Sequence, residues 1–325
     1  MIEIRFLALI ILVPWCVARG QELQFQDIPP SGFAPDAVRK APLSPESRKA
    51  LEESLNTHDF QHAESILVKE IDRSPESPEL LTLAGAIFFL DGKYLNSAIA
   101  MNKADALAAL DDRSRFTLAM AYVTLNHRDW ARPELEKLTH SDPVNALYPY
   151  WLSRLDYDAM DFYSAVANAK KALELDPDFM KAFDELGLCY EALGKYDEAI
   201  AAYQNAERLN AKAHPCSLWP SLDFGTLLIK LDRLAEAEGR LKQSLACDSR
   251  SPRGHYQMGL LLEKEKKDDQ AVVELKQAAA QDPAYAEPYY HLGRIYQRQG
   301  DPQKAEVAWE TFQKLKRAQS KERPH

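Results

Sequence analysis

The chain has 325 residues, of which 46% are hydrophobic and 27% are charged, so it can bury a sizeable core. Only 12 glycines and no sustained alternation of apolar and polar residues argue against a β-protein. The net charge of −9 argues against broad nucleic-acid binding, because neutralising phosphates requires a basic surface.

The first predicted element, residues 1–20, has the features of a secretory signal. Arg5 gives a positively charged start, and the apolar run from Phe6 to Ala18 is shorter than the roughly 20 residues that a membrane span needs. A small-residue cleavage site ends at Gly20. We therefore expect a periplasmic or secreted protein with no membrane span after cleavage; the alternative is an uncleaved N-terminal anchor.

The second predicted element is a linker over residues 21–43, which carries four prolines and no helical period. We expect it to be extended.

From Ser44 onward, the sequence repeats every 34 residues, with one slip of four residues between Ala211 and Pro220. A small residue marks each unit, and the series is Ala63, Ser97, Ala131, Ala165, Ala199, Ala237, Ala271 and Ala305. Four residues later a mostly large side chain follows, at Leu67, Met101, Leu135, Ala169, Tyr203, Leu241, Leu275 and Trp309. This spacing predicts two antiparallel helices per unit, because small residues allow close approach and large ones fill the remaining volume.

Three glycines, Gly92, Gly194 and Gly300, fall where the first helix of a unit must end and turn. A single helix pair cannot bury its apolar face alone, so we expect the units to stack.

This pattern resembles the tetratricopeptide repeat family, most closely in the fifth unit through Gly187, Tyr190, Ala199, Tyr203 and Ala206. The resemblance to exported bacterial members implies an all-α fold, a right-handed α-solenoid (superhelix) of about eight helix-turn-helix units over residues 44–319. The expected units are 44–77, 78–111, 112–145, 146–179, 180–213, 218–251, 252–285 and 286–319, followed by a basic polar tail over 320–325.

In this family, the second, fifth, ninth and twelfth positions of a unit tend to face a concave groove. Aromatic side chains and arginines, which are common interface anchors, occupy many of them here, together with one methionine: Phe89, Phe116, Met120, Tyr150, Arg154, Tyr157, Trp219, Tyr256, Tyr290 and Arg294. The resemblance thus implies a non-catalytic scaffold that binds a protein or peptide ligand in this groove. Alternatively, some of these side chains pack between units or are covered by the linker.

Family members that clamp a C-terminal carboxylate use Lys and Asn in the groove, whereas the fifth unit has Asp184 and Leu188. This departure favours recognition of an extended peptide or a protein surface.

No catalytic motif or Cys-x-x-Cys pair occurs, and His58 and His62 straddle a predicted turn, so we expect no cofactor and no metal site. A structural subunit of a cell-envelope assembly or secretion complex is the second hypothesis, and an enzyme with an unrecognised site is the third.

Three cysteines follow the signal, Cys189, Cys216 and Cys247. An odd number leaves at least one thiol free, and whether the other two form a disulfide stays open.

Overall fold

The computed structural model describes residues 35–321, so the predicted signal and residues 21–34 of the predicted linker lie outside the described residues. The described chain divides into two compact units, an N-terminal unit of residues 35–206 and a C-terminal unit of residues 207–321. Within these residues there are 17 helices and no strand, which confirms the predicted all-α solenoid of helix pairs.

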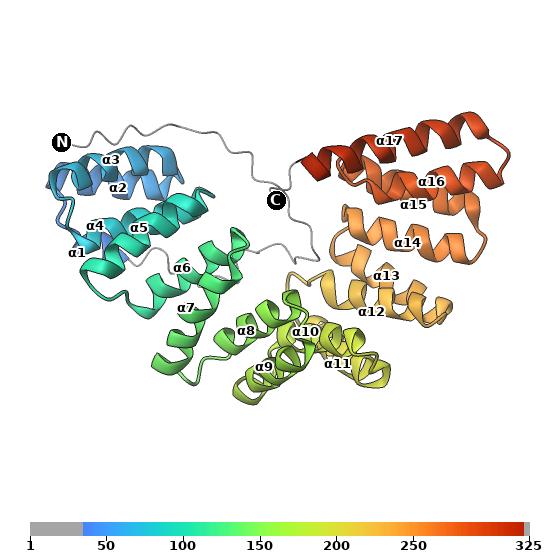
Figure 1. Cartoon of the computed structure of the whole chain (residues 1–325), viewed down its shortest axis with the longest axis horizontal. Helices are drawn as coiled ribbons and strands as arrows, with labels where there is room; N and C mark the ends of the chain where they lie inside the picture. Colours follow the sequence, from blue (N-terminus) through green and yellow to red (C-terminus); the bar gives the residue numbers. More distant parts are fainter. Residues whose placement is uncertain (1–34, 322–325) are drawn as a thin grey trace. The chain divides into compact units, whose positions relative to one another are not determined.

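The helices of the N-terminal unit stack in chain order (Figure 1). They are α1 (Pro35–Lys40), α2 (Pro45–Asn56), α3 (Phe60–Arg73), α4 (Pro78–Leu90), α5 (Tyr94–Leu107), α6 (Asp112–Thr124), α7 (Arg128–Ser141), α8 (Leu147–Asp158), α9 (Phe162–Leu175), α10 (Met180–Ala192) and most of α11 (Tyr196–Asn210).

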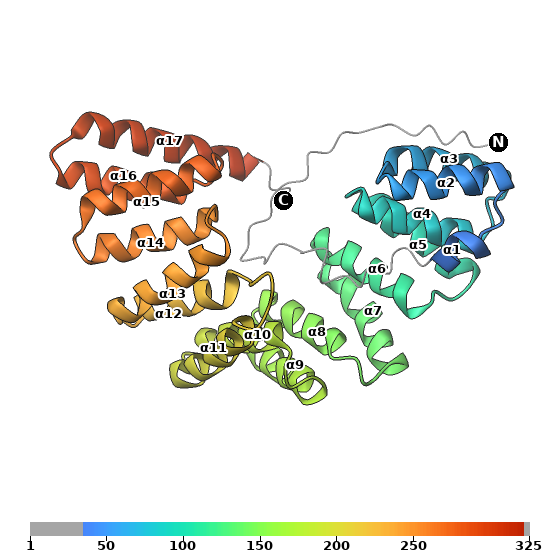
Figure 2. The same cartoon turned by 180° about the vertical axis from the view of Figure 1, so that it is seen from behind.

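The C-terminal unit continues the same alternation (Figure 2). After the last turn of α11, its helices are α12 (Trp219–Lys230), α13 (Leu234–Cys247), α14 (Pro252–Lys264), α15 (Asp268–Gln281), α16 (Glu287–Arg298) and α17 (Pro302–Lys321). From α2 onward, the even-numbered helices are the first helices of their pairs. We call the side of the first helices that faces away from the second helices the inner face.

Several first helices begin with the signals that their sequences carry. Ser44, Ser77 and Ser251 precede α2, α4 and α14, and each side chain accepts a hydrogen bond from a backbone N–H of the first turn. Each serine is followed by a proline, which is preorganised for the first helical position and needs no hydrogen-bond acceptor there.

The glycine and the large residue of a pair meet between the two helices, as the repeat pattern predicts. A Cβ atom placed on Gly187 would lie 2.5 Å from the Tyr203 ring, and one on Gly85 would lie 2.8 Å from Met101. In the fourth pair the serine at the glycine position, Ser153, instead donates a hydrogen bond to the Ala165 carbonyl at 2.8 Å. The 34-residue period therefore records contacts between paired helices.

The turn between the helices of a pair requires one residue in the left-handed region. Glycine supplies it at Gly92, Gly194 and Gly300, with φ of 72°, 72° and 76°. The other pairs place non-glycine residues there with φ near 60°: His58, Asn126, Met160, Asp232 and Lys266. His58 is thus an exposed turn residue, and His62 is also exposed.

Residues 35–43 depart from the extended linker that the sequence predicts. Residues 35–40 form α1, which contacts α2 and α4, and Val38 in this helix and Ala41 and Leu43 after it are buried. Such a short helix is not stable alone, so tertiary packing of these apolar side chains stabilises it.

Cys216 and Cys247 form a disulfide with a Cα–Cα distance of 5.5 Å, and Cys189 is free and buried. The bond joins the segment before α12 to the last residue of α13. Asn210 holds the same segment, because its side chain hydrogen-bonds both the backbone N–H and the carbonyl of Ser217.

A span of the bilayer would need a longer and more apolar helix than any found between residues 35 and 321.

Candidate functional site

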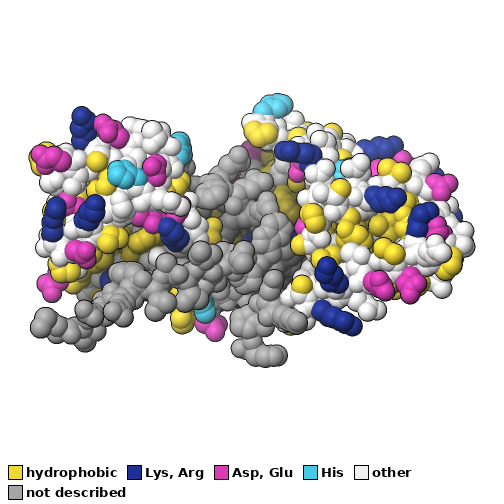
Figure 3. Space-filling model, turned by 90° about the horizontal axis from the view of Figure 1, so that it is seen from above, with side chains coloured by type: hydrophobic (Ala, Val, Ile, Leu, Met, Phe, Trp, Pro, Cys, Tyr) yellow, Lys and Arg dark blue, Asp and Glu magenta, His cyan; other side chains and the backbone are white. Residues whose placement is uncertain are grey.

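The candidate site lies on the first helices of the C-terminal unit. We call it the C-terminal face and define it by Trp219 on α12, Arg253 and Tyr256 on α14, and Tyr290 and Arg294 on α16. Tyr256 and Tyr290 are 34 residues apart, so they occupy the same position on two neighbouring first helices. Figure 3 shows hydrophobic side chains beside Lys and Arg side chains on the surface of the C-terminal unit.

Rings of this face are supported by other rings. Tyr256 packs on Tyr285 with a centroid distance of 5.1 Å and on His291 at 5.7 Å. Tyr290 packs on Phe312 at 5.5 Å, yet it remains 42% exposed. Both tyrosines are therefore held in place while part of each side chain stays accessible.

Two arginines stack on the aromatic side chains. The guanidinium carbon of Arg253 lies 5.4 Å from the Trp219 ring centroid, and that of Arg294 lies 5.9 Å from the Tyr290 centroid. Stacking of this kind orients a guanidinium while leaving its N–H groups able to donate to a carboxylate. The face thus combines apolar surface with positive charge.

The nearest buried carboxylate of the face, Glu263, lies close to three nitrogen-bearing side chains. Its oxygens lie 2.7 Å from His291 Nδ1, 2.9 Å from Arg298 Nη1 and 3.7 Å from Arg294 Nη2. Although burial opposes ionisation, the hydrogen bonds from His291 and Arg298 lower the pKa of Glu263 to about 2. Glu263 therefore stays ionised, and the Arg294 side chain keeps 47% of its surface exposed.

Tyr256 is a neutral hydrogen-bonding group at physiological pH. Burial, with the nearby carboxylates Glu287 and Glu263, raises the pKa of Tyr256 to about 12. Its hydroxyl lies 3.3 Å from His291 Nε2, which connects it to the Glu263 network.

The structure separates the ten residues predicted for the groove into three groups. Trp219, Tyr256, Tyr290 and Arg294 are half-exposed or exposed. Phe89, Phe116, Met120 and Tyr150 are buried, with 2%, 3%, 0% and 0% of their surface exposed, so they do not line an open groove as the sequence predicted.

The physical reason is that all four side chains belong to one buried hydrophobic cluster of the N-terminal unit, in which three of them also pack on other rings. Phe89 packs on Tyr94 with a centroid distance of 5.2 Å, Phe116 on Tyr148 at 5.9 Å, and Tyr150 on Phe179 at 5.0 Å.

The last two predicted residues, Arg154 and Tyr157, are half-buried in the N-terminal unit. Arg154 donates a hydrogen bond to the Tyr150 hydroxyl at 3.3 Å and lies 3.7 Å from a Glu185 carboxylate oxygen. Tyr157 packs on Phe162 with a centroid distance of 5.4 Å. These two residues lie on α8 of the N-terminal unit and are not part of the C-terminal face.

Sequence reasoning missed Arg253, Glu263, His291 and Arg298. Arg253 and Glu263 stand at the second and twelfth positions of their unit, which was a usable signal, but charged residues at helix surfaces are usually solvated. His291 and Arg298 lie outside the four groove positions, and their roles depend on Glu263 of the preceding unit.

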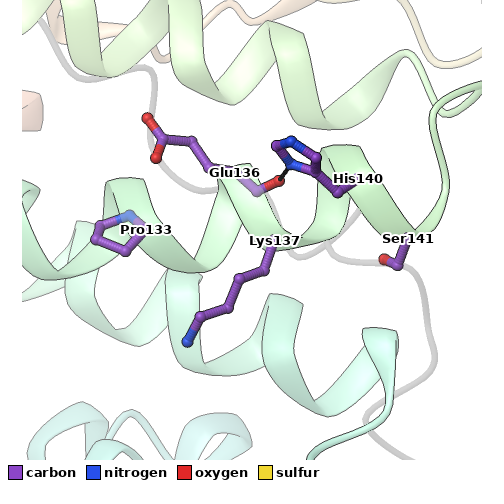
Figure 4. Close-up of a pocket in the computed structure, with 5 residues that line it drawn as sticks. All are labelled: Pro133, Glu136, Lys137, His140 and Ser141. Atoms are coloured by element: carbon purple, nitrogen blue, oxygen red, sulfur yellow. Dashed lines mark hydrogen bonds between the residues drawn. The ribbon is translucent and has the colours of Figure 1, made fainter.

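A shallow depression on α7 is lined by Pro133, Glu136, Lys137, His140 and Ser141 (Figure 4). His140 Nδ1 lies 2.7 Å from the backbone oxygen of Glu136. All five residues come from one helix, so no opposing element encloses a small ligand there.

Comparison with protein families gives three matches in the second half of the chain. A model described as Tetratricopeptide repeat matches residues 178–250, one described as TPR repeat matches residues 264–300, and another Tetratricopeptide repeat model matches residues 286–319. No curated protein matches the chain.

Solved structures share the fold. A tetratricopeptide repeat protein from Parabacteroides merdae aligns with a TM-score of 0.64 at 15% identity, covering 84% of this chain and 99% of that one. A chain of the APC/C hetero-tetramer Cut9–Hcn1 aligns with a TM-score of 0.61 at 17% identity, covering 75% of this chain and 48% of that one, so this chain spans about half its length. PilF from Pseudomonas aeruginosa aligns with a TM-score of 0.56 at 19% identity, covering 63% of this chain and 91% of that one.

At these identities the structural likeness concerns the fold alone. Together with the matches between residues 178 and 319, the stacked helix pairs support the tetratricopeptide repeat family for this chain.

Proposed function

We propose that the chain is a non-catalytic scaffold whose C-terminal face binds an extended segment of a protein or peptide. The observation that carries this proposal is the set of accessible aromatic side chains and arginines on three successive first helices. Tyr, Trp and Arg are the residues that most often supply binding energy at interfaces.

The mechanism is preorganisation. Tyr256 and Tyr290 are already packed against other rings, and Arg294 is already stacked on Tyr290. A face held in this way loses little side-chain entropy on binding, so more of the energy of ring burial appears as affinity. Because Arg253 and Arg294 present positive charge, the segment should carry apolar side chains and carboxylates.

The test uses the double variant Trp219→Ala/Tyr290→Ala. We expect partner binding to weaken by about 2–4 kcal/mol, since each anchor commonly contributes more than 1 kcal/mol. The measurement is quantitative recovery of partners from a native-host extract, followed by titration of the purified partner.

The control variant is Val273→Ala, because Val273 on α15 is 57% exposed but lies on a second helix of the C-terminal unit. It should bind as the wild type does. If the double variant folds and binds the partner as tightly as the wild type does, the C-terminal face is not the binding site.

We also propose export to an oxidising compartment. The signal-like residues 1–20 and the disulfide between Cys216 and Cys247 support this proposal, since disulfides persist mainly in secreted and periplasmic proteins. N-terminal sequencing of the fractionated protein tests this proposal. We expect protein that starts at Gln21 in the periplasm or the medium. Protein that keeps Met1 in a membrane fraction would show that residues 1–20 are an uncleaved anchor.

A second candidate function is a structural subunit of an envelope assembly that uses its second helices. Four large hydrophobic side chains on the second helices of the N-terminal unit support this candidate, with exposed fractions of 49% for Leu95, 48% for Ile99, 55% for Trp130 and 73% for Tyr163. Purification only as a stable complex, disrupted by Trp130→Ala/Tyr163→Ala, would favour it over reversible peptide binding.

A further inference from the structure

The two tyrosines of the C-terminal face belong to a continuous row of five rings, which we call the ring row. His291 stands between them, with centroid distances of 5.7 Å to Tyr256 and 5.4 Å to Tyr290. Tyr285 extends the row beyond Tyr256 at 5.1 Å, and Phe312 extends it beyond Tyr290 at 5.5 Å. None of the five residues is buried, so the ring row is accessible to a ligand.

The repeat sets the spacing of equivalent positions along this row. Tyr256 and Tyr290 stand at the fifth position of neighbouring units, on the contacting helices α14 and α16. Packed helices have interaxial distances of roughly 8–10 Å. The separation of the two rings is also at most the sum of their centroid distances to His291. A ligand that uses both tyrosines should therefore present equivalent side chains about 10 Å apart.

The polar groups of the C-terminal face are mainly hydrogen-bond donors. The Arg253 guanidinium stacks on Trp219 but forms no ion pair or hydrogen bond with residues 35–321. The Trp219 indole N–H and the Tyr290 hydroxyl also have no hydrogen-bond partner in this described part of the chain. Arg and Trp side chains donate hydrogen bonds but cannot accept them. The face therefore suits a ligand that brings acceptors and few donors.

We propose that the C-terminal face binds a proline-rich, acidic segment of a partner protein in the polyproline II conformation, an inference that rests on the proposed function. This conformation has three residues per turn and a rise of about 3.1 Å per residue, so equivalent side chains lie about 9 Å apart. An extended β-strand presents the same side at intervals of about 7 Å. The polyproline II period is the closer match to the spacing of neighbouring first helices.

The hydrogen-bonding pattern favours the same ligand. Proline has no backbone N–H, and a polyproline II helix has no internal hydrogen bonds, so the segment brings free carbonyls and few donors. The Trp219 N–H and the Tyr290 hydroxyl can donate to these carbonyls, while the pyrrolidine rings pack on the ring row. A strand-like ligand would also need backbone acceptors, and helices use their own carbonyls internally.

The charges of the face indicate acidic residues between the prolines. Arg253 has no carboxylate partner among the described residues, and Arg294 reaches Glu263 only at 3.7 Å. Both guanidinium groups are oriented by stacking on rings of the face. The carboxylate of Glu287, at the repeat position of Arg253, is already paired with Lys316. Carboxylates of the ligand would therefore find positive charge at Arg253 and Arg294.

The test measures the affinity of the full chain for labelled synthetic peptides by fluorescence anisotropy. A peptide of four Pro-Pro-Glu repeats should bind at least about tenfold more tightly than four Gly-Ser-Glu repeats, which have the same charge but lose more conformational entropy on binding. Four Pro-Pro-Lys repeats should bind at least about tenfold more weakly than the Pro-Pro-Glu peptide, because their charge is reversed.

Substitutions locate the bound peptide. Tyr290→Ala should lower the affinity for the Pro-Pro-Glu peptide at least about tenfold, whereas Tyr290→Phe, which keeps the ring, should lower it only about twofold to threefold. Arg253→Gln should remove the preference for Pro-Pro-Glu over Pro-Pro-Gln repeats. Val273→Ala, on a second helix of the same unit, should bind as the wild type does. Circular dichroism checks that each variant is folded.

Three results would overturn the inference. Equal affinity for the Pro-Pro-Glu and Gly-Ser-Glu peptides would show that the face recognises charge alone. Unchanged binding by folded Tyr290→Ala would place the proline-rich segment elsewhere on the protein. The third result is a Pro-Pro-Glu peptide that fails to compete with a natural partner whose binding requires Trp219 and Tyr290. In that case the proposed function would stand, but its ligand would have a different conformation.

Discussion

Side chains at the same repeat position differ in exposure between the first helices of the N-terminal unit and those of the C-terminal unit. Tyr150 and Tyr290 both stand at the fifth position of their units, and they are 0% and 42% exposed. Both kinds of helix keep the same close contact with their second helices, as Gly85 against Met101 and Gly259 against Leu275 illustrate. The repeat thus determines how paired helices pack, whereas the inner face is free to become core or binding surface.

Two buried glutamates give the same comparison in electrostatic terms. Burial raises the pKa of Glu185 to about 7. The charge of Arg154, which lies 3.7 Å away, lowers this pKa but does not offset the burial. Glu263 has hydrogen bonds from His291 and Arg298, which outweigh its burial and lower its pKa to about 2. The deeper burial of Glu185 and the two hydrogen bonds to Glu263 together decide which form of each carboxyl is stable.

The largest expected effect on stability comes from removing the disulfide between Cys216 and Cys247. Residues 35–206 of the N-terminal unit contain no disulfide. Cys216→Ala/Cys247→Ala should destabilise the C-terminal unit by about 3–4 kcal/mol, since a bond closing a loop of this length limits the entropy of the unfolded chain. Denaturant unfolding followed by hydrogen exchange in each unit measures this. The reduced wild type should be as unstable as the variant. If the oxidised wild type were no more stable than the variant, the disulfide would not form.

Glu263 and Glu185 should make the free energy of unfolding depend on pH with opposite signs. Linkage between proton binding and folding gives each a contribution of about 2–3 kcal/mol. Glu263 has a lower pKa folded than its unfolded value of about 4.3, so its contribution is present above about pH 4 and is lost as the pH falls toward 2. Glu185 has a higher pKa folded, so the N-terminal unit should lose stability as the pH rises from about 4 to 7.

Glu263→Gln and Glu185→Gln are each other's controls. Each should flatten the pH dependence of its own unit in unfolding experiments and leave that of the other unit unchanged. Parallel pH profiles in the two wild-type units would contradict the contrast between the two carboxyl environments.

A smaller effect tests the packing that the two units share. Gly187→Ala should cost about 1–2 kcal/mol, because its Cβ would lie 2.5 Å from the Tyr203 ring. Gly239→Ala is the matched control, since an added Cβ there meets nothing within 4 Å, and it should stabilise the chain by about 0.5–1 kcal/mol. Thermal melting distinguishes them, and a neutral Gly187→Ala would show that the helices of that pair are not in close contact.

The smallest effect concerns the turns. Lys266 has a φ of 61°, and glycine stands at the same repeat position in the fifth and eighth pairs, as Gly194 and Gly300. Because only glycine adopts this conformation without steric cost, Lys266→Gly should stabilise the chain by about 0.5–1 kcal/mol. Lys267→Gly, one residue later at a φ of −89°, should not stabilise it. Equal melting shifts for both variants would mean that the left-handed conformation carries no cost.

The sequence predicted the helix pairs because the contacts within a pair are local. Gly187 and Tyr203 are 16 residues apart, and their contact repeats in unit after unit, so it leaves a period that can be read. The same regularity identified Gly92 as a turn residue. These parts of the fold needed no information about distant segments.

The inner face could not be predicted in this way. Phe116 and Tyr256 stand at equivalent positions, but their exposure depends on what lies against them rather than on their own helix. The partner of Cys216 was equally open, because nothing in the spacing of three cysteines selects Cys247. Helix α1 was missed because its six residues have no helical period and are held by tertiary contacts.

The most direct test of the contrast between the two inner faces is hydroxyl-radical footprinting of the full chain, read by mass spectrometry at individual tyrosines. Tyr290 and Tyr256 should be modified several-fold faster than Tyr150 in the folded protein, and all three at similar rates after denaturation. Modification of Tyr150 as fast as that of Tyr290 in the folded chain would contradict the account, because both inner faces would then be open.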